Sequence, residues 1–193
     1  GLHCFDNDGG KVWSKDLGTF PGGWGVGASP IIFNEMVIQN CDAEGASSLI
    51  ALDRKTGDEI WRTPREDKPR GGWSTPIVID VDGQPELILN GEFGVAAYNP
   101  NTGESLWNCT GFNGRGTPAP VWGHGRLYVV NGKSGDVYAV RPGGRGDVTK
   151  THMVWHTERR GGRDLPSPIL VDDCLVASRM SGIARGYDAH TGQ

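Results

Sequence analysis

The sequence contains no long apolar segment, and this absence excludes a membrane-spanning helix. Its apolar stretches are short, such as residues 48–52 and 127–130, whereas a membrane span requires roughly 18 consecutive apolar residues. The N-terminus shows no charged segment followed by an apolar one, so we expect any export signal to lie upstream of residue 1 or to have been removed. No transmembrane segment is expected.

Closely spaced cysteines are also missing. The four cysteines form no C-x-x-C pair, which argues against a thiolate zinc site and against thioredoxin-type redox chemistry; they are Cys4, Cys41, Cys109 and Cys174. Isolated buried thiols are the simplest interpretation. Disulfides between distant cysteines stay open, because four cysteines allow three pairings and the sequence does not choose among them.

Neither charge nor motif indicates nucleic acid or catalysis. The 19 Lys and Arg residues face 23 Asp and Glu residues, and the net charge is -4 with no long block of one sign, so no nucleic-acid partner is expected. The nucleophile elbow G-x-S-x-G, the phosphate-binding loop and the zinc motif H-E-x-x-H are absent from the sequence. No catalytic residue is predicted.

What the sequence has in abundance is glycine, with 31 residues, together with a motif that recurs. An aromatic or apolar residue is followed by Asp or Asn, a turn ending in Gly, and then Trp. Copies occupy residues 5–13, 52–61 and 98–107; a fourth at 140–155 has an enlarged turn, and a fifth at 187–193 ends before its tryptophan. The tryptophans at positions 13, 61, 107 and 155 are separated by 48, 46 and 48 residues, a spacing typical of propeller blades.

A second marker has the same period, because a Ser-Pro or Thr-Pro pair precedes an apolar run at residues 29–30, 75–76, 117–118 and 167–168. Within one unit, four short strands are expected at residues 76–80, 86–90, 95–98 and 104–107, joined by Gly- and Asn-containing turns. The sequence therefore predicts an all-β fold, a β-propeller built of four-stranded antiparallel blades, with about four blades in this chain.

The blades are expected to form one partial propeller domain over residues 1–193, with limits near 1–25 (partial), 26–70, 71–113, 114–162 and 163–193 (partial). Because a four-stranded sheet cannot bury both faces alone, neighbouring blades must pack face to face. We expect the repeat tryptophans to wedge between blades, each donating its indole N–H to a carbonyl. The predicted docking residues are Trp13, Asp53, Gly57, Trp61, Gly103, Trp107 and Trp155.

The repeat resembles the PQQ-like (pyrroloquinoline-quinone-like) repeat family, whose docking motif A-x-D-x-x-T-G-x-x-x-W is seen whole from Ala51 to Trp61. The resemblance covers essentially the whole chain and implies half of an eight-bladed ring. The family includes quinoprotein dehydrogenases, the propeller lipoprotein of outer-membrane barrel assembly and many uncharacterised bacterial propellers. It implies a non-catalytic scaffold that binds a protein or a ligand and is periplasmic or secreted.

The alternative is a fragment of a PQQ-dependent quinoprotein dehydrogenase, which would bind PQQ with Ca²⁺ and carry its catalytic residues outside this chain. Dehydrogenases of the family have two adjacent cysteines over the quinone and a calcium-binding set of Glu, Asn and Asp. This sequence has no adjacent cysteines and no assignable calcium set. The name of the repeat does not by itself imply the cofactor, so a scaffold without cofactors is the favoured interpretation.

The sequence begins in what reads as a third strand, at residues 2–6, and stops inside another blade at Gly192. An open propeller exposes an apolar blade face at each end. We therefore expect either a piece of a longer protein or a homodimer in which two half-rings close one eight-bladed ring. Dimerisation is the expectation for a chain that folds by itself.

The candidate binding residues lie in the connections that enter successive blades: Trp24, Arg70, Trp73, Arg115 and Arg163. In a propeller these connections gather at the mouth of the central channel. Arginine and tryptophan there suit an anionic or peptide ligand, so we predict a protein or small ligand at the channel mouth. The structural alternative is that each arginine binds carbonyls or carboxylates of a neighbouring blade.

No metal site is predicted. His152 and His156 stand four residues apart, but in a strand that spacing separates them by roughly 13 Å. Asp80 and Asp82 belong to a hairpin turn and lack the further acidic ligands of a calcium loop. The Arg-Gly-Asp tripeptide at residues 145–147 is interpreted as part of a glycine-rich turn.

Overall fold

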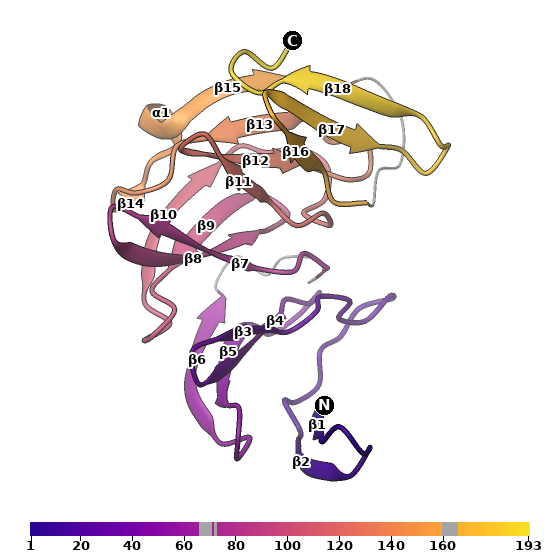
Figure 1. Cartoon of the computed structure of the whole chain (residues 1–193), viewed down its shortest axis with the longest axis vertical. Coiled ribbons are helices and arrows are strands. Elements are labelled where there is room, and N and C mark those ends of the chain that lie inside the picture. The colour runs from indigo at the N-terminus through magenta and orange to yellow at the C-terminus, as the bar shows by residue number, and fades with distance from the viewer. Residues whose placement is uncertain (66–70, 72, 160–165) are drawn as a thin grey trace.

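The computed structural model describes residues 1–65, 71, 73–159 and 166–193, and in this part of the chain the strands form five successive sheets (Figure 1). The first sheet pairs β1 (Leu2–Phe5) with β2 (Lys11–Lys15). The second contains β3 (Ile31–Phe33), β4 (Met36–Cys41), β5 (Ser47–Asp53) and β6 (Glu59–Arg65). The third contains β7 (Ile77–Val81), β8 (Gln84–Asn90), β9 (Gly94–Tyr98) and β10 (Ser105–Thr110). The fourth contains β11 (Val121–Gly123), β12 (Arg126–Val130), β13 (Val137–Val140) and β15 (Met153–Thr157). The fifth contains β16 (Ile169–Val171), β17 (Cys174–Ser178) and β18 (Ala184–Asp188).

Each sheet is an up-and-down antiparallel meander, because its blade strands are neighbours in the same order as in the sequence. Three sheets have all four blade strands, and the first and last are represented by two and three strands within the described residues. Figure 1 shows the sheets fanned out in chain order, from β1 and β2 at the indigo end to β18 at the yellow end. The all-β propeller prediction is confirmed, and the number of sheets agrees with a partial propeller.

Two-residue turns join the first two strands of each sheet from the second to the fifth. The first turn residue has φ between +48° and +53° in each case: Asn34, Asp82, His124 and Asp172. Asn, Asp and Gly tolerate this left-handed conformation, and primed turns match the right-handed twist of the flanking strands. His124 is the position where the residue type departs from that preference.

The third sheet has a further edge strand that the sequence did not indicate. β14 (Gly146–Asp147) pairs in parallel with the outer strand β10 at Trp107 and Asn108. It lies in the segment expected to be an enlarged turn of the following blade, which also forms the helix α1 (Thr149–His152). Since β10 continues to Thr110, three residues past the expected strand end, its outer edge offers backbone groups to the insertion. The four blade strands keep their predicted order, and the insertion adds to them.

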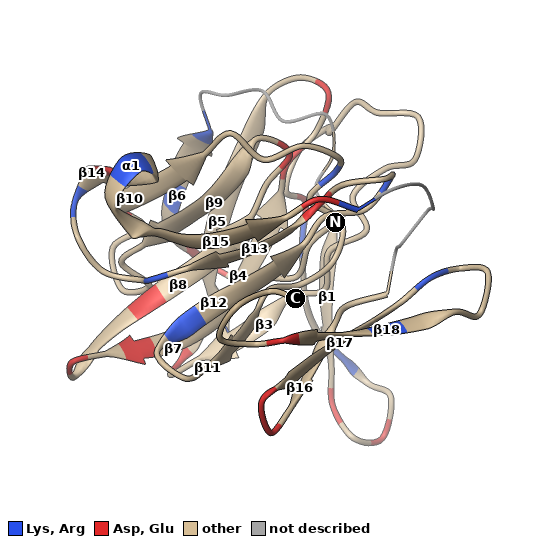
Figure 2. Ribbon diagram, turned by 90° about the horizontal axis from the view of Figure 1, so that it is seen from above, with Lys and Arg blue, Asp and Glu red and all other residues tan. Residues whose placement is uncertain are grey.

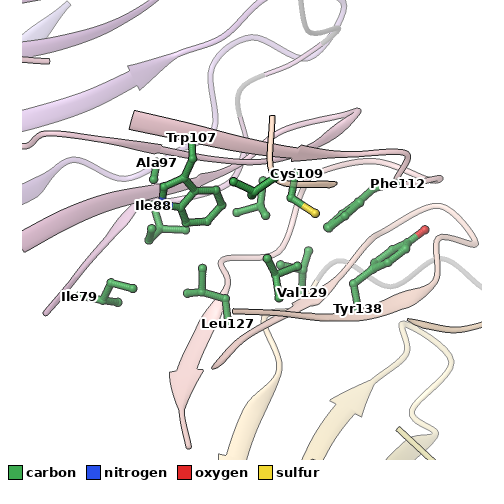
Figure 3. Packing of buried hydrophobic residues seen from close by; sticks show 12 residues of the cluster. Ile79, Ile88, Ala97, Trp107, Cys109, Phe112, Leu127, Val129 and Tyr138 are labelled. Atoms are coloured by element: carbon green, nitrogen blue, oxygen red, sulfur yellow. The ribbon is translucent and has the colours of Figure 1, made fainter. Parts of the chain in front are cut away.

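Apolar side chains from facing sheets fill the space between blades. Between the third and fourth sheets, Ile88, Trp107 and Cys109 meet Leu127 and Tyr138, and all five are buried (Figure 3). Similar clusters hold the second sheet to the third and the fourth to the fifth. Burial of apolar surface stabilises these contacts by roughly 25 cal/mol per Å². The contacts fix each blade relative to the next, and so fix the positions of the connections between blades.

Tryptophans on the outer strands dock onto a glycine turn of the next sheet. The ring of Trp61 lies over Gly103, where a Cβ would come within 2.6 Å of a ring carbon, and its Nε1 donates to the Pro100 carbonyl at 3.1 Å. The Thr63 hydroxyl donates to the Gly103 carbonyl at 2.6 Å. The same arrangement joins Trp13 to Gly57 and Trp155 to Gly192, with indole bonds to the carbonyls of Arg54 and Ala189.

Asp53 holds the shape of one docking turn. Its carboxylate accepts the backbone N–H groups of Lys55 at 2.8 Å and Thr56 at 2.9 Å. These bonds, that from Thr56 first, lower the pKa of Asp53 because they favour the charged form. Asp188 holds the turn at Gly192 in the same way, through the N–H groups of His190 and Thr191.

Trp107 docks differently from the other repeat tryptophans. Its Nε1 donates to the carboxylate of Glu86 at 2.8 Å, and not to a carbonyl of the following blade as the sequence suggested. The physical reason is the insertion, because the fourth copy of the repeat has no Asp-x-x-Thr-Gly turn to offer a carbonyl. Gly143, in the insertion, donates its N–H to the same Glu86 carboxylate at 3.4 Å.

Candidate functional site

A pocket of about 520 Å³ lies where the connections entering four successive blades converge. Its walls come from the segments that precede β3, β7, β11 and β16, with one residue from the turn between β12 and β13. The lining residues are Trp24, Gly27, Trp73, Thr75, Arg115, Thr117, Ala119, Lys133 and Ser167. The connection that enters each blade is thus a repeated segment, and its copies in successive blades line one shared cavity.

Trp73 is the most tightly held aromatic residue of the pocket. Its Nε1 donates to the Gly25 carbonyl at 3.1 Å, and the Arg115 guanidinium lies 5.2 Å from its ring centroid, within cation–π range. Two glycines let the ring approach the backbone, because a Cβ on Gly27 would come within 2.9 Å of the indole and one on Gly71 within 2.4 Å. The ring is thus preorganised, which lowers the entropic cost of binding.

Arg115 is placed by its own backbone. It exchanges two backbone hydrogen bonds with Gly132, at 2.9 and 2.8 Å, and its carbonyl accepts the N–H of Thr117 at 2.7 Å. The next residue, Gly116, packs so closely that a Cβ would lie 2.2 Å from the Gly91 carbonyl oxygen. The Arg115 side chain therefore projects from a turn whose backbone is held in place. Trp24, in the connection before β3, is 81 % exposed.

Two of the Ser-Pro and Thr-Pro markers join neighbouring blades by hydrogen bonds in the wall of the pocket. The Thr75 hydroxyl accepts the N–H of Ser29 at 3.1 Å, and the Ser167 hydroxyl accepts the N–H of Ala119 at 3.0 Å. The carbonyl of Pro118 accepts both the Ser74 hydroxyl and the Asn90 side-chain amide. The hydroxyls of Thr75 and Ser167 thus accept hydrogen bonds from the preceding blade. The regular spacing of the markers in the sequence did not reveal this role.

Charge in the pocket has one sign. Arg115 and Lys133 are basic, and none of the described lining residues is acidic. Elsewhere the charges are mixed, and Figure 2 shows Lys and Arg as well as Asp and Glu scattered over strands and loops. A basic pocket with two indole faces favours a ligand that carries a carboxylate or phosphate beside an apolar group.

The structure brings three of the five predicted binding residues together, since Trp24, Trp73 and Arg115 line the same pocket. Arg70 and Arg163 lie outside the described residues. Lys133 was missed because it belongs to a turn inside a blade and not to a connection between blades. That these residues bind a ligand stays a prediction.

The other titratable clusters considered from the sequence are structural or exposed. His152 lies in α1 and not in a strand as expected, while His156, on β15, contacts the Asp136 carboxylate at 2.8 Å. The four cysteines, all within the described residues, are free thiols. Burial raises the pKa of Cys41 and of Cys109 to about 11, so these two thiols are unreactive at neutral pH.

No helix within the described residues is long and apolar enough to cross a membrane.

Sequence comparison matches the whole chain, residues 1–193, to the family described as "Outer membrane protein assembly factor BamB". Two curated proteins of that name are similar to this chain. The one from Burkholderia pseudomallei is 26% identical over 142 residues, which cover 69% of this chain and 34% of that protein. The one from Marinobacter adhaerens is 25% identical over 131 residues, 65% of this chain and 31% of that protein. The chain spans about a third of the length of these relatives.

Solved structures show the same fold. BamB from Moraxella catarrhalis superposes with a TM-score of 0.73 at 16% identity, over 99% of this chain and 56% of that chain. The quinohemoprotein alcohol dehydrogenase from Comamonas testosteroni superposes with a TM-score of 0.72 at 17% identity, over 99% of this chain and 39% of that chain. At these identities the likeness establishes the fold, and a shared fold does not carry a shared function.

Proposed function

This chain belongs to the family of the outer membrane protein assembly factor BamB, and from that premise we propose that it is a non-catalytic, protein-binding part of a bacterial propeller that acts outside the cytoplasm. The observation that carries the proposal is the basic, aromatic pocket at the convergence of the blade connections. We propose that it holds an extended segment of a partner protein through one carboxylate and one apolar side chain.

The composition of the pocket supports protein binding. Tryptophan and arginine are the residues most enriched at the energetic centres of protein interfaces. The Trp73 ring is held by its hydrogen bond to Gly25 and by glycine contacts, and the backbone of Arg115 is held by hydrogen bonds to Gly132, which lowers the entropic cost of binding a partner. Lys133 adds a second cation for a carboxylate.

The dehydrogenase alternative has weaker support. The dehydrogenases are similar to this chain in fold alone, at 17% and 15% identity, whereas the family model and the curated relatives carry the BamB description. The four cysteines at positions 4, 41, 109 and 174 offer no adjacent pair. Reduction of an artificial electron acceptor by the chain with PQQ and Ca²⁺ would favour it over the scaffold.

The test uses a panel of extended peptides taken from bacterial outer membrane proteins, each made with its Asp and Glu residues intact and with Asn and Gln in their place. Binding to the full chain is measured by fluorescence anisotropy. We expect the carboxylate peptides to bind better than their amide forms, and Arg115→Gln to reduce affinity about tenfold, the loss of one charge-assisted bond.

Matched variants separate the pocket from general surface effects. Arg145→Gln removes an exposed arginine outside the pocket, and Trp122→Ala removes an exposed tryptophan on β11. Both should bind as the wild type does, whereas Trp24→Ala and Arg115→Gln should not. Equal affinity of the carboxylate and amide peptides, or equal loss in pocket and control variants, would contradict the proposed function.

Closure of a full ring by two copies also stays a proposal. Apolar side chains are exposed on the outermost sheets, with Val12 on the first and Ile169 and Val171 on the last each at least half exposed. Light scattering gives the mass in solution: a dimer agrees with two half-rings, and a monomer at high concentration contradicts them.

A further inference from the structure

Two histidines and an aspartate from adjacent blades converge at a place outside the pocket. His124 lies in the turn between β11 and β12, Asp173 in the turn between β16 and β17, and His190 in the docking turn after β18. The Asp173 carboxylate oxygen Oδ1 is 2.9 Å from His190 Nε2 and 3.7 Å from His124 Nε2. The three ligand atoms all lie within 4.8 Å of one another.

We propose that these three side chains form a binding site for Zn²⁺ or a similar divalent transition metal, which links the fourth blade to the fifth. Zinc binds imidazole nitrogen and carboxylate oxygen at about 2.0–2.2 Å, and tetrahedral geometry then sets ligand atoms about 3.3 Å apart. The distances from Asp173 to the two imidazoles lie on either side of that value. Two nitrogen ligands and one oxygen suit zinc, nickel or copper better than calcium or magnesium, which prefer oxygen.

The surrounding structure holds the ligands in place. The backbone N–H of His190 donates to Asp188, and the Arg126 guanidinium binds the His190 carbonyl at 3.0 Å. The N–H of Ala189 donates to the Asp173 carbonyl at 2.8 Å, which joins the two turns that carry these ligands. Nδ1 of His124 lies 3.5 Å from the hydroxyl of the buried Tyr128, so the second nitrogen of this imidazole faces a polar group of its own blade.

The second blade shows what the same positions look like without a metal site. There Glu35 occupies the turn position of Asp173, and Lys55 occupies the docking-turn position of His190. Glu35 forms ordinary exposed ion pairs with Lys55 at 3.1 Å and Arg54 at 2.8 Å. Lysine ammonium has no lone pair to offer a metal, whereas neutral imidazole has one.

His124 also differs from its equivalents in a way that the turn does not require. The matching residues Asn34, Asp82 and Asp172 have the same positive φ and are the types that this conformation favours. Histidine at this position brings a nitrogen toward the neighbouring blade, where its ring stacks on His190 with centroids 5.2 Å apart. The site is exposed, so a fourth ligand, water or a partner group, can complete the coordination.

The residues of the other blades supply conservative variants for the test. His124→Asn introduces the residue that the second blade has at the equivalent turn position, Asn34. His190→Lys introduces the lysine that the second blade has at the equivalent position, Lys55, where it pairs with Glu35. Both should fold, because each pattern is already present in this chain. His3→Gln removes an exposed histidine elsewhere as a control. All proteins carry Cys4→Ser and Cys174→Ser, so that accessible thiols do not bind the metal.

The full chain is stripped with a chelator and titrated with ZnCl₂, and bound zinc is measured by equilibrium dialysis with elemental analysis, alongside thermal unfolding. We expect one saturable equivalent of zinc in the parent and in His3→Gln, with a higher Tm that a chelator reverses. His124→Asn and His190→Lys should bind at least about tenfold more weakly and lose the Tm increase. No saturable binding in the parent, or unchanged affinity in both variants, would overturn the site.

Discussion

Substituting Gly103 by alanine should weaken the contact between the second and third blades, and should destabilise the protein more than the same substitution at a turn glycine that touches no neighbouring blade. The residue has φ +74°, and an added Cβ would lie 2.4 Å from Thr63 Oγ1 and 2.6 Å from a ring carbon of Trp61. The left-handed conformation costs a non-glycine residue about 1–2 kcal/mol, and overpacking of a docked ring about 1–3 kcal/mol more. The expected total is about 2–5 kcal/mol, a large part of a typical domain stability.

Gly83 provides the matched control within the same blade. It has φ +79°, and a Cβ there would meet no atom within 4 Å. Gly83→Ala should therefore cost only the backbone term. The difference between the two variants isolates the docking contact, and at about 2–4 °C per kcal/mol it should place the Tm of Gly103→Ala about 2–12 °C below that of Gly83→Ala.

Urea unfolding followed by tryptophan fluorescence and thermal unfolding followed by circular dichroism both measure the effect. If Gly103→Ala and Gly83→Ala have the same stability, the glycine does not serve the tryptophan contact and the docking account is refuted.

Three further outcomes follow from single contacts. Asp136→Asn should cost about 1–3 kcal/mol at neutral pH. Burial raises the pKa of the Asp136 carboxyl, but hydrogen bonds from the Arg159 backbone and from the His156 and Asn113 side chains outweigh it and lower the pKa. Wild-type stability should therefore fall as pH drops below about 4, and in acid titrations followed by fluorescence the variant should lose the part of that fall that Asp136 contributes. Glu86→Ala should cost about 1–3 kcal/mol in urea melts because it leaves the buried Trp107 N–H unpaired, while Glu86→Gln should stay near wild type. Tyr98→Phe, which removes a hydroxyl that bonds the buried Arg65 across two blades, should cost about 0.5–1.5 kcal/mol in the same assay.

The repeat made most of the fold predictable from sequence. The period fixed the number of blades, and the four strands expected around residues 76–107 correspond to β7 through β10. The strand β14 was not predictable, because Gly146 and Asp147 are poor strand formers and pair only where the edge of β10 is open. The unusual partner of Trp107 has the same origin in the insertion.

The candidate sites show a similar limit. Trp24, Trp73 and Arg115 lie in the equivalent connections of successive blades, so their convergence could be expected from the repeat. Lys133 lies outside the repeated connection and was not expected. Asp173 and His190 meet because two turns of the fifth blade lie side by side, and only the packing of the fourth blade on the fifth brings His124 to them.

The central claim is that the pocket at the blade connections is the partner-binding surface, and hydrogen–deuterium exchange tests it most directly. The full chain is compared with and without the tightest carboxylate peptide of the panel. The account predicts added protection in the segments around residues 24–27, 73–75 and 115–119, with little change in the outer strands β2, β6, β10 and β15. Protection confined to the outer strands, with none in the three connections, would contradict it.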